Sequence, residues 1–333
     1  MATAIFNSRS FHGTYVPPDS PVPEHLLGRV VFGLGLPRPQ DPRQVVVAIE
    51  SVGATHWAEQ WVSTRPVQCG FEDGFGYSHN GEVLFGSIHL PESELVDLER
   101  ATLKIYVRLQ QMLQRLGYPC CLRVWNFLAG INAGDGDQER YRLFSAGRSR
   151  ALALKPDFEQ RLPAATAIGL SEPGLVIYFL AGKVPGAPVE NPRQISAYRY
   201  PRQYGPRSPS FSRATLIGTG PDTRLLVSGT ASVVGHESRH AGDPERQLEE
   251  TLTNFDAVVA TALHDHFPGQ RPASRVESVK LYLREASLAQ RLAGWLPRLC
   301  GDGHAPLMCL HGDICRHDLL LEAEAVFRID AAL

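Results

Sequence analysis

L-L-L-E-A-E-A-V-F, residues 319–327, is the last apolar run of the chain and has the length of a strand. Strand side chains alternate between two faces. One face therefore carries Leu319, Leu321, Ala323, Ala325 and Phe327, and the other carries Leu320, Glu322, Glu324 and Val326. A carboxyl group among apolar neighbours is costly to ionise, so burial of this strand would raise its pKa. A carboxylic acid that stays protonated near neutral pH can donate a proton to a substrate.

The same run also fits an edge strand whose two glutamates face water. Cys315, in the motif D-I-C-R-H-D-L, lies where the chain enters this strand. Which description applies depends on what the rest of the chain builds around residues 319–327.

The two halves of the chain repeat one order of elements. In the first half, apolar periodicity predicts a helix at Leu95–Leu116 and strands at Cys121–Leu128 and Leu175–Leu180. The second half has matching elements, namely a strand at Leu225–Val234, a helix at Pro244–Phe267, a strand at Ser278–Arg284, a helix around Leu288–Leu299, and the run 319–327. The offset of roughly 150 residues suits a duplicated domain. Only the second copy ends in a strand with acids, which favours a role for Glu322 or Glu324.

The sequence therefore predicts an α+β fold of two domains, each a mixed sheet packed on two helices. Residues 1–43 are rich in proline and polar groups and are expected to form an irregular N-terminal arm. The expected domains cover residues 44–183 and 214–333. Between them, the connector 184–213 is too aromatic and too cationic for a solvated tether, so we expect it to line a site.

The composition is that of an ordinary globular protein, with 43% hydrophobic and 20% charged residues. The formal net charge is -2, which gives no global field to attract nucleic acid or an anionic membrane. The six cysteines form no C-x-x-C pair, and neither a signal core nor a membrane-length apolar run is evident. These features favour a cytoplasmic protein with reduced thiols.

Arginine dominates the cations of this chain, because lysine occurs only at Lys104, Lys155, Lys183 and Lys280. A guanidinium group matches a carboxylate in two-point contact. Arginine clusters in a nearly neutral protein therefore indicate a small anionic ligand. One cluster is Arg140, Arg142, Arg148 and Arg150, which also fits a solvated helix face. Arg142 and Arg148 are its candidates for substrate binding.

The motif H-E-S-R-H, residues 236–240, matches the pattern of zinc proteases. That chemistry needs both histidines on one face of a helix, together with a further ligand. Gly235 and Gly242 bracket the motif too closely for a stable helix, and no further ligand is evident. We therefore expect no metal site, and interpret His236 as a polar loop residue.

Five long segments carry a resemblance to a known family. They are R-V-W-N-F-L-A-G-I-N (123–132), E-R-Y-R-L-F-S-A-G-R (139–148), A-Y-R-Y-P-R-Q-Y-G-P-R-S-P-S-F-S-R-A (197–214), L-V-S-G-T-A-S-V-V-G-H-E-S (226–238) and G-D-I-C-R-H-D-L-L-L-E-A-E-A-V-F (312–327). Together they resemble the chorismatase family, which hydrolyses chorismate to pyruvate and a cyclic acid. The chain is most similar to the subgroup of the xanthomonadin pigment pathway, which makes 3- and 4-hydroxybenzoate. Each half also resembles the YjgF/RidA-like (chorismate-mutase-like) fold.

The resemblance implies roles for individual residues. Glu322 matches the catalytic acid of the family. Tyr200 and Arg213 match residues that hold one substrate carboxylate, and Arg148 is expected to hold the other. No metal or redox cofactor is implied.

The resemblance also implies a product. Family members with glycine at the position of Gly229 and cysteine at that of Cys315 form 3-hydroxybenzoate. Members with alanine there release a dihydroxylated diene instead. This chain has the first pair, so 3-hydroxybenzoate is expected, and 4-hydroxybenzoate as a second product stays open.

Three other functions fit parts of the sequence. A YjgF-like deaminase of imines or enamines would use the same arginines and glutamate, and a non-catalytic protein could bind an aromatic acid through the connector. The zinc hydrolase is the third. The expected partner is chorismate, without nucleic acid or membrane, and the chain is either a monomer or a homotrimer.

Overall fold

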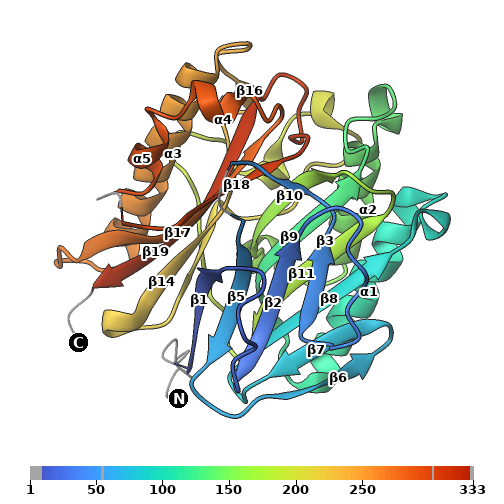
Figure 1. Cartoon of the computed structure of the whole chain (residues 1–333). Helices are drawn as coiled ribbons and strands as arrows, with labels where there is room; N and C mark the ends of the chain where they lie inside the picture. Colours follow the sequence, from blue (N-terminus) through green and yellow to red (C-terminus); the bar gives the residue numbers. More distant parts are fainter. Residues whose placement is uncertain (1–9, 54–55, 302–303, 331–333) are drawn as a thin grey trace.

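The structure is a computed structural model that describes residues 10–53, 56–301 and 304–330. Two large sheets stand face to face, each with helices on its outer side, and a smaller N-terminal sheet lies across the gap between them (Figure 1). Within the described residues, no helix is both long and apolar enough to cross a bilayer.

The first large sheet has the strand order β10-β9-β11-β8-β7-β6. Its strands are β6 (Gln68–Glu72), β7 (Phe75–His79), β8 (Val83–Leu90), β9 (Cys120–Ala129), β10 (Ala164–Leu170) and β11 (Leu175–Gly182). Strands β9 and β10 are parallel, whereas β11 runs antiparallel to both β9 and β8. Helices α1 (Leu98–Leu116) and α2 (Arg140–Leu152) cover its outer face (Figure 1).

The second large sheet has the strand order β12-β13-β14-β19-β17-β18-β4. Its strands are β4 (Glu50–Ser51), β12 (Ala187–Val189), β13 (Ala214–Ile217), β14 (Thr223–Thr230), β17 (Ala273–Leu283), β18 (Leu307–His311) and β19 (Leu321–Asp330). Helices α3 (Pro244–His266), α4 (Leu288–Arg291) and α5 (Leu296–Leu299) lie on its outer face (Figure 1).

The two large sheets share one topology. The order β10-β9-β11-β8-β7 of the first corresponds to β18-β17-β19-β14-β13 of the second, and each has its parallel pair at the same place. In both copies the long helix follows the second strand of the hairpin, since α1 comes after β8 and α3 after β14. The predicted α+β class and the duplicated plan are thus confirmed.

The prediction of an irregular N-terminal arm is wrong for the part that the structure describes. Strands β1 (Phe11–Val16), β2 (Leu26–Phe32), β3 (Gln44–Val47) and β5 (Ala58–Ser63) form a sheet in the order β1-β5-β2-β3. The prolines of this region lie between the strands and not within them, so they do not interrupt the ladders. Val30 and Trp61 are buried between the sheets, and burial of this apolar surface stabilises the strands.

Several other boundaries differ from the sequence prediction. The strand predicted at Leu225–Val234 ends at Thr230, where β14 is irregularly paired, and β15 (Val233–Val234) forms a small hairpin with β16 (Glu237–Ser238). The helix predicted around Leu288–Leu299 is two short helices. The last strand starts at Leu321, so Leu319 packs between the sheets instead of facing α3 with Leu321.

The long helices begin and end where the sequence supplies capping groups. The Asp97 side chain accepts a hydrogen bond from the Arg100 amide at the start of α1, and Asp243 does the same for Arg246 in α3. Gly117 ends α1 in the left-handed conformation, with φ 79°, which glycine adopts without a steric cost. The helix α1 therefore starts three residues later than the apolar pattern predicted, and it ends at Leu116 as predicted.

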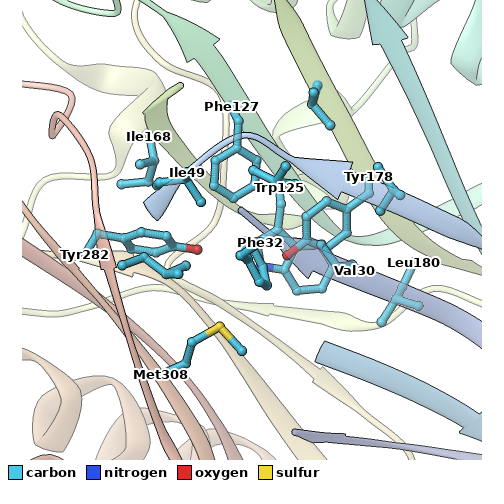
Figure 2. Close-up of a cluster of buried hydrophobic side chains, with 14 of the residues drawn as sticks. Val30, Phe32, Ile49, Trp125, Phe127, Ile168, Tyr178, Leu180, Tyr282 and Met308 are labelled. Atoms are coloured by element: carbon cyan, nitrogen blue, oxygen red, sulfur yellow. The ribbon is translucent and has the colours of Figure 1, made fainter. Parts of the chain in front are cut away.

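Strand alternation divides the core into three clusters. One face of β11 contributes Ile177 and Phe179 to the cluster under α1, and the other face contributes Tyr178 and Leu180 to the cluster between the sheets. A third cluster lies between β19 and α3. Figure 2 shows the cluster between the sheets, where Trp125 and Tyr178 stack with centroids 4.5 Å apart.

Strand β19 is a central strand, paired with β14 and β17, so the edge-strand alternative is excluded. Leu321 and Ala323 face α3, whereas Glu322 and Glu324 face the first sheet with 4% and 5% exposure. Glu324 lies in a buried charge cluster, which we define as Glu59, Arg123, Lys280 and Glu324. The Lys280 Nζ is 2.8 Å from Glu324 Oε1 and 2.8 Å from Glu59 Oε2.

Replacing Lys280 by methionine should destabilise the fold strongly. Lys280→Met leaves two buried carboxylates without their shared cation, a change that costs about 3–5 kcal/mol. Denaturant unfolding at neutral pH measures the loss. Arg150→Ala is the control, because it breaks a surface ion pair with Glu99 and should cost at most about 1 kcal/mol. Equal losses in the two variants would contradict a structural role for the charge cluster.

Candidate active site

A cavity of about 480 Å³ opens between the two domains. Its walls come from α2 and β10 of the first domain, β14 and β19 of the second, the connector, and the loop that precedes β19. The residues that line this cavity include Tyr141, Arg142, Arg148, Thr166, Tyr200, Tyr204, Arg213, Gly229, Cys315, Arg316 and Glu322. All seven residues that the sequence analysis proposed for the site are in this set.

Glu322 projects from β19 into the cavity. Burial raises the pKa of Glu322 to about 8, and the negative charge of Glu324 adds to this. Hydrogen bonding to Cys315 and the charges of Arg123 and Arg213 act in the opposite direction. At neutral pH the Glu322 carboxyl is therefore mainly protonated, as the apolar strand predicted.

Gly229 faces this carboxyl from the neighbouring strand β14. A Cβ at position 229 would overlap Oε1 of Glu322 and would lie 3.3 Å from Cγ2 of Thr166. Glycine is required here by close approach and not by backbone conformation, since φ of Gly229 is not in the left-handed region. The present position of the Glu322 side chain depends on the missing methyl group.

Cys315 lies on the other side of the same carboxyl, with its Sγ 3.8 Å from Glu322 Oε2. Burial raises the pKa of the Cys315 thiol, and Glu322 raises it further. The thiol is therefore neutral, and can act as a weak donor or as a shape element, but is a poor nucleophile.

Arg213 and Tyr200 form one cationic unit of the wall. Arg213 is 7% exposed, and its Nη2 donates to the Tyr200 hydroxyl at 2.8 Å and to the Ile195 carbonyl at 2.9 Å. The guanidinium also lies over the Phe211 ring. Its Nε has no hydrogen-bond partner within residues 10–53, 56–301 and 304–330.

Arg148 forms the second cationic unit. It projects from α2 with 4% exposure and lies over the Tyr106 ring. Neither Nε nor Nη2 of Arg148 has a hydrogen-bond partner in the described part of the chain. A buried cation with unsatisfied N–H groups is costly, so these donors favour an anionic ligand. Two such units in one cavity suit a molecule with two carboxylates.

The other arginines of α2 have different positions. Arg142 lines the cavity, but its Nε is 3.3 Å from the Glu139 carboxylate, so its charge is already compensated. Arg140 and Arg150 point away from the cavity and pair with Glu92 and Glu99. The solvated-face alternative therefore holds for Arg150, whereas Arg140 is half-buried and also donates to the Ala129 carbonyl.

Two further cavity residues, Arg316 and Tyr141, are not among those predicted from the sequence. Arg316 lies over the Tyr204 ring at 4.2 Å and donates to the His236 carbonyl at 2.8 Å. It follows Cys315 directly in the D-I-C-R-H-D-L motif, which was the available signal. Tyr141 lies within the E-R-Y-R segment, but nothing in the sequence distinguishes it from a tyrosine of the hydrophobic core.

The H-E-S-R-H motif is not helical. His236 lies in the β15–β16 turn, with Nδ1 3.2 Å from the Tyr204 hydroxyl, and His240 has a left-handed backbone with φ 59°. Among the residues that the structure describes, no group of three or more His, Cys, Asp or Glu could hold a metal ion.

The chain is similar to characterised proteins over most of its length. Residues 59–181 match the family described as chorismatase FkbO/Hyg5-like, N-terminal. A 3-hydroxybenzoate synthase of Streptomyces hygroscopicus is 35% identical over 286 residues, which cover 82% of each chain. A chorismatase of Streptomyces rapamycinicus is 36% identical over 280 residues, covering 81% of this chain and 82% of its own. A crystal structure of a chorismatase superimposes with a TM-score of 0.86 at 30% identity, covering 95% of this chain and 98% of its own.

The raised pKa of Glu322 should make stability depend on pH. Between the ordinary value of 4.5 and about 8, the native state holds a proton that the unfolded chain has lost. Raising the pH through this window therefore destabilises the native state, by roughly 3–5 kcal/mol in total. Glu322→Gln removes this titration. The unfolding free energy of the native protein, measured at several pH values, should therefore fall to that of the variant, or below it, as the pH rises. A constant difference between the two proteins would contradict the raised pKa.

Proposed function

Because this chain belongs to the chorismatase family, we propose that it converts chorismate to pyruvate and 3-hydroxybenzoate, with Glu322 as the general acid. The single observation that carries this proposal is a buried Glu322, with a pKa that burial raises to about 8, in the same cavity as two arginines with unsatisfied donors. The names of the relatives, chorismatase and 3-hydroxybenzoate synthase, support the same reaction.

Chorismate carries two carboxylates, one on the ring and one on the enolpyruvyl arm. Arg213 with Tyr200 would hold one of them, and Arg148 the other. Two-point contacts of this kind fix orientation as well as position, which lowers the entropic barrier to reaction. Arg142, already paired with Glu139, would act at longer range on the same negative charge.

The reaction would begin with proton transfer from Glu322 to the methylene carbon of the enol ether. The resulting oxocarbenium ion is stabilised by the neighbouring carboxylate of the pyruvyl arm. The ring hydroxyl then attacks the adjacent ring carbon, the carbon–oxygen bond to the pyruvyl group breaks, and pyruvate leaves. The attack forms an epoxide, which opens and loses a ring proton to give 3-hydroxybenzoate. The proton released from the hydroxyl restores the acid form of Glu322. The atoms of chorismate are divided between the two products without added water or oxidant.

Gly229 and Cys315 would direct the reaction towards this product. The absence of a side chain at position 229 leaves the Glu322 carboxyl where it is, and the neutral Cys315 thiol lies beside it. The same pair of residues accompanies 3-hydroxybenzoate formation in the family that the chain resembles.

The direct test is incubation of the purified protein with chorismate, without metal or cofactor, and separation of the products by chromatography. Pyruvate and 3-hydroxybenzoate in equal amounts are expected, and any 4-hydroxybenzoate would show a second product. Intact chorismate together with turnover of an enamine would instead support the imine-deaminase alternative.

Glu322→Gln should fold but lose turnover. A general acid contributes about 10²- to 10⁴-fold, and the amide cannot donate the proton that protonates the substrate. Pyruvate release under saturating chorismate measures the loss. Glu249→Gln, which removes a carboxylate from the surface of α3, should retain full activity. Near-normal turnover of Glu322→Gln would eliminate Glu322 as the acid.

The double variant Gly229→Ala with Cys315→Ala should shift the product towards the dihydroxylated diene. The new Cβ at position 229 overlaps the present position of the Glu322 carboxyl, which must move, and loss of the thiol opens space beside it. The ratio of the two products, measured by chromatography, is the readout. An unchanged ratio at any rate of turnover would remove both residues from product control.

A further inference from the structure

We propose that Glu324, which does not line the cavity, is a positioning residue that keeps Glu322 in its acid form by engaging both cations of the buried charge cluster. This inference rests on the proposed role of Glu322 as the proton donor. It assigns to the second glutamate of the E-A-E motif a function distinct from that of the first.

Glu324 is a fully satisfied carboxylate. Its Oε1 accepts hydrogen bonds from Trp125 Nε1 at 2.7 Å and from Lys280 Nζ at 2.8 Å. Its Oε2 accepts from Arg123 Nη2 at 2.8 Å and from Thr166 Oγ1 at 2.6 Å. Burial opposes ionisation of Glu324, but Lys280 and Arg123 outweigh it and hold its pKa below the usual range. Glu324 is therefore a fixed anion.

The buried charge cluster is electrically balanced without Glu322. Its two cations, Arg123 and Lys280, face two anions, Glu324 and Glu59. Neither cation donates a hydrogen bond to Glu322, whose contact with a side chain is the Cys315 thiol. A proton lost from Glu322 would therefore leave a buried carboxylate that makes no ion pair with either cation of the cluster, which is unfavourable.

Glu324 also fixes the geometry around Glu322. The Thr166 hydroxyl that donates to Glu324 accepts a hydrogen bond from the Gly229 amide at 3.0 Å. Gly229 is the residue whose missing side chain makes room for the Glu322 carboxyl. The two glutamates lie two residues apart on one face of β19, so the position of one constrains the other.

Other titratable groups also face Glu322, one from each of the elements that pack around it. They are Arg123 on β9, Tyr282 on β17, Tyr141 on α2, Arg213 on the connector and Cys315 in the loop before β19. Arg123 and Arg213 favour the ionised form of Glu322, and the Cys315 thiol donates to it. Of the groups named here, Glu324 is the one that is anionic at neutral pH, so its charge opposes these effects.

Two double variants separate this role from a general contribution to folding. Glu324→Gln with Lys280→Met removes one anion and one cation from the cluster, and leaves Arg123 facing Glu322 without Glu324. Glu59→Gln with Lys280→Met removes the same charges but keeps the Glu324 carboxylate on Arg123. The two variants have the same net charge. Glu59→Gln with Lys280→Met should be more stable than Lys280→Met alone, because the carboxylate that loses its cation is removed with it. Glu324→Gln with Lys280→Met leaves Glu59 without Lys280 and Arg123 without Glu324, and should be the less stable of the two.

The readout is the protonated carboxyl band of Glu322 in infrared difference spectra, assigned by its absence in Glu322→Gln. In the Glu324→Gln pair this band should titrate at least about one pH unit lower than in the native protein, since a neighbouring charge shifts a buried carboxyl by this amount or more. The basic limb of kcat for pyruvate release should move with it. In the Glu59→Gln pair both should stay near the native position.

The outcomes are distinguishable from failure of the proposed function. A band that moves only in the Glu324→Gln pair supports the inference even if chorismate proves not to be the substrate. Chorismate turnover with a band that moves in neither pair, or equally in both, overturns the inference and leaves the function intact. If the first pair does not fold, Glu324→Gln alone leaves Arg123 without its carboxylate while Lys280 keeps Glu59, and an unshifted band in that variant would overturn the inference.

Discussion

The structure depends on one buried carboxylate, that of Glu324, at which the domains meet. Arg123 and Thr166 reach it from the first large sheet, and Lys280 reaches it from the second. Lys280 also contacts Glu59 of the N-terminal sheet, so three sheets converge on one cluster of charges. Because a buried charge without its partner is costly, this cluster allows few other ways for the sheets to face each other.

The cavity is a consequence of that arrangement. Glu322 lies on the same face of β19, two residues from Glu324, and lines the cavity that Glu324 does not reach. Arg148 comes from the first domain, Arg213 and Tyr200 from the connector, and Cys315 from the loop before β19. Neither domain contains the site by itself, since each contributes one side of the wall.

Duplication explains why the chemistry lies in only one copy. Strand β11 corresponds to β19. By the register with the neighbouring strands, β9 in the first copy and β17 in the second, Val176 takes the position of Glu322 and Tyr178 that of Glu324. Tyr178 stacks on Trp125 and donates to Glu59, so the first copy supplies aromatic surface and hydrogen bonds. The second copy supplies the carboxyls. The first domain is thus a support for the acids of the second.

Much of this could be predicted from the sequence, because the information is local or repeated. Apolar periodicity gave the long helices and the central strands, the order of elements revealed the duplication, and the run 319–327 identified Glu322 on a largely apolar strand. The strands of residues 11–32 were missed because their prolines dominate the composition, although those prolines lie in the loops between strands. For Arg316 the local signal is only its place directly after Cys315, and its contact with Tyr204 depends on how the connector packs.

The sequence by itself determined that two glutamates share one face of a strand, since alternation along a strand is a property of the chain. Only the tertiary structure decided that these glutamates differ. Arg123, 201 residues away in sequence, reaches Glu324 and not Glu322, whereas Glu322 meets a glycine and a thiol. The physical reason is that the charge of a buried carboxyl depends on the groups that packing brings beside it, and these come from other sheets.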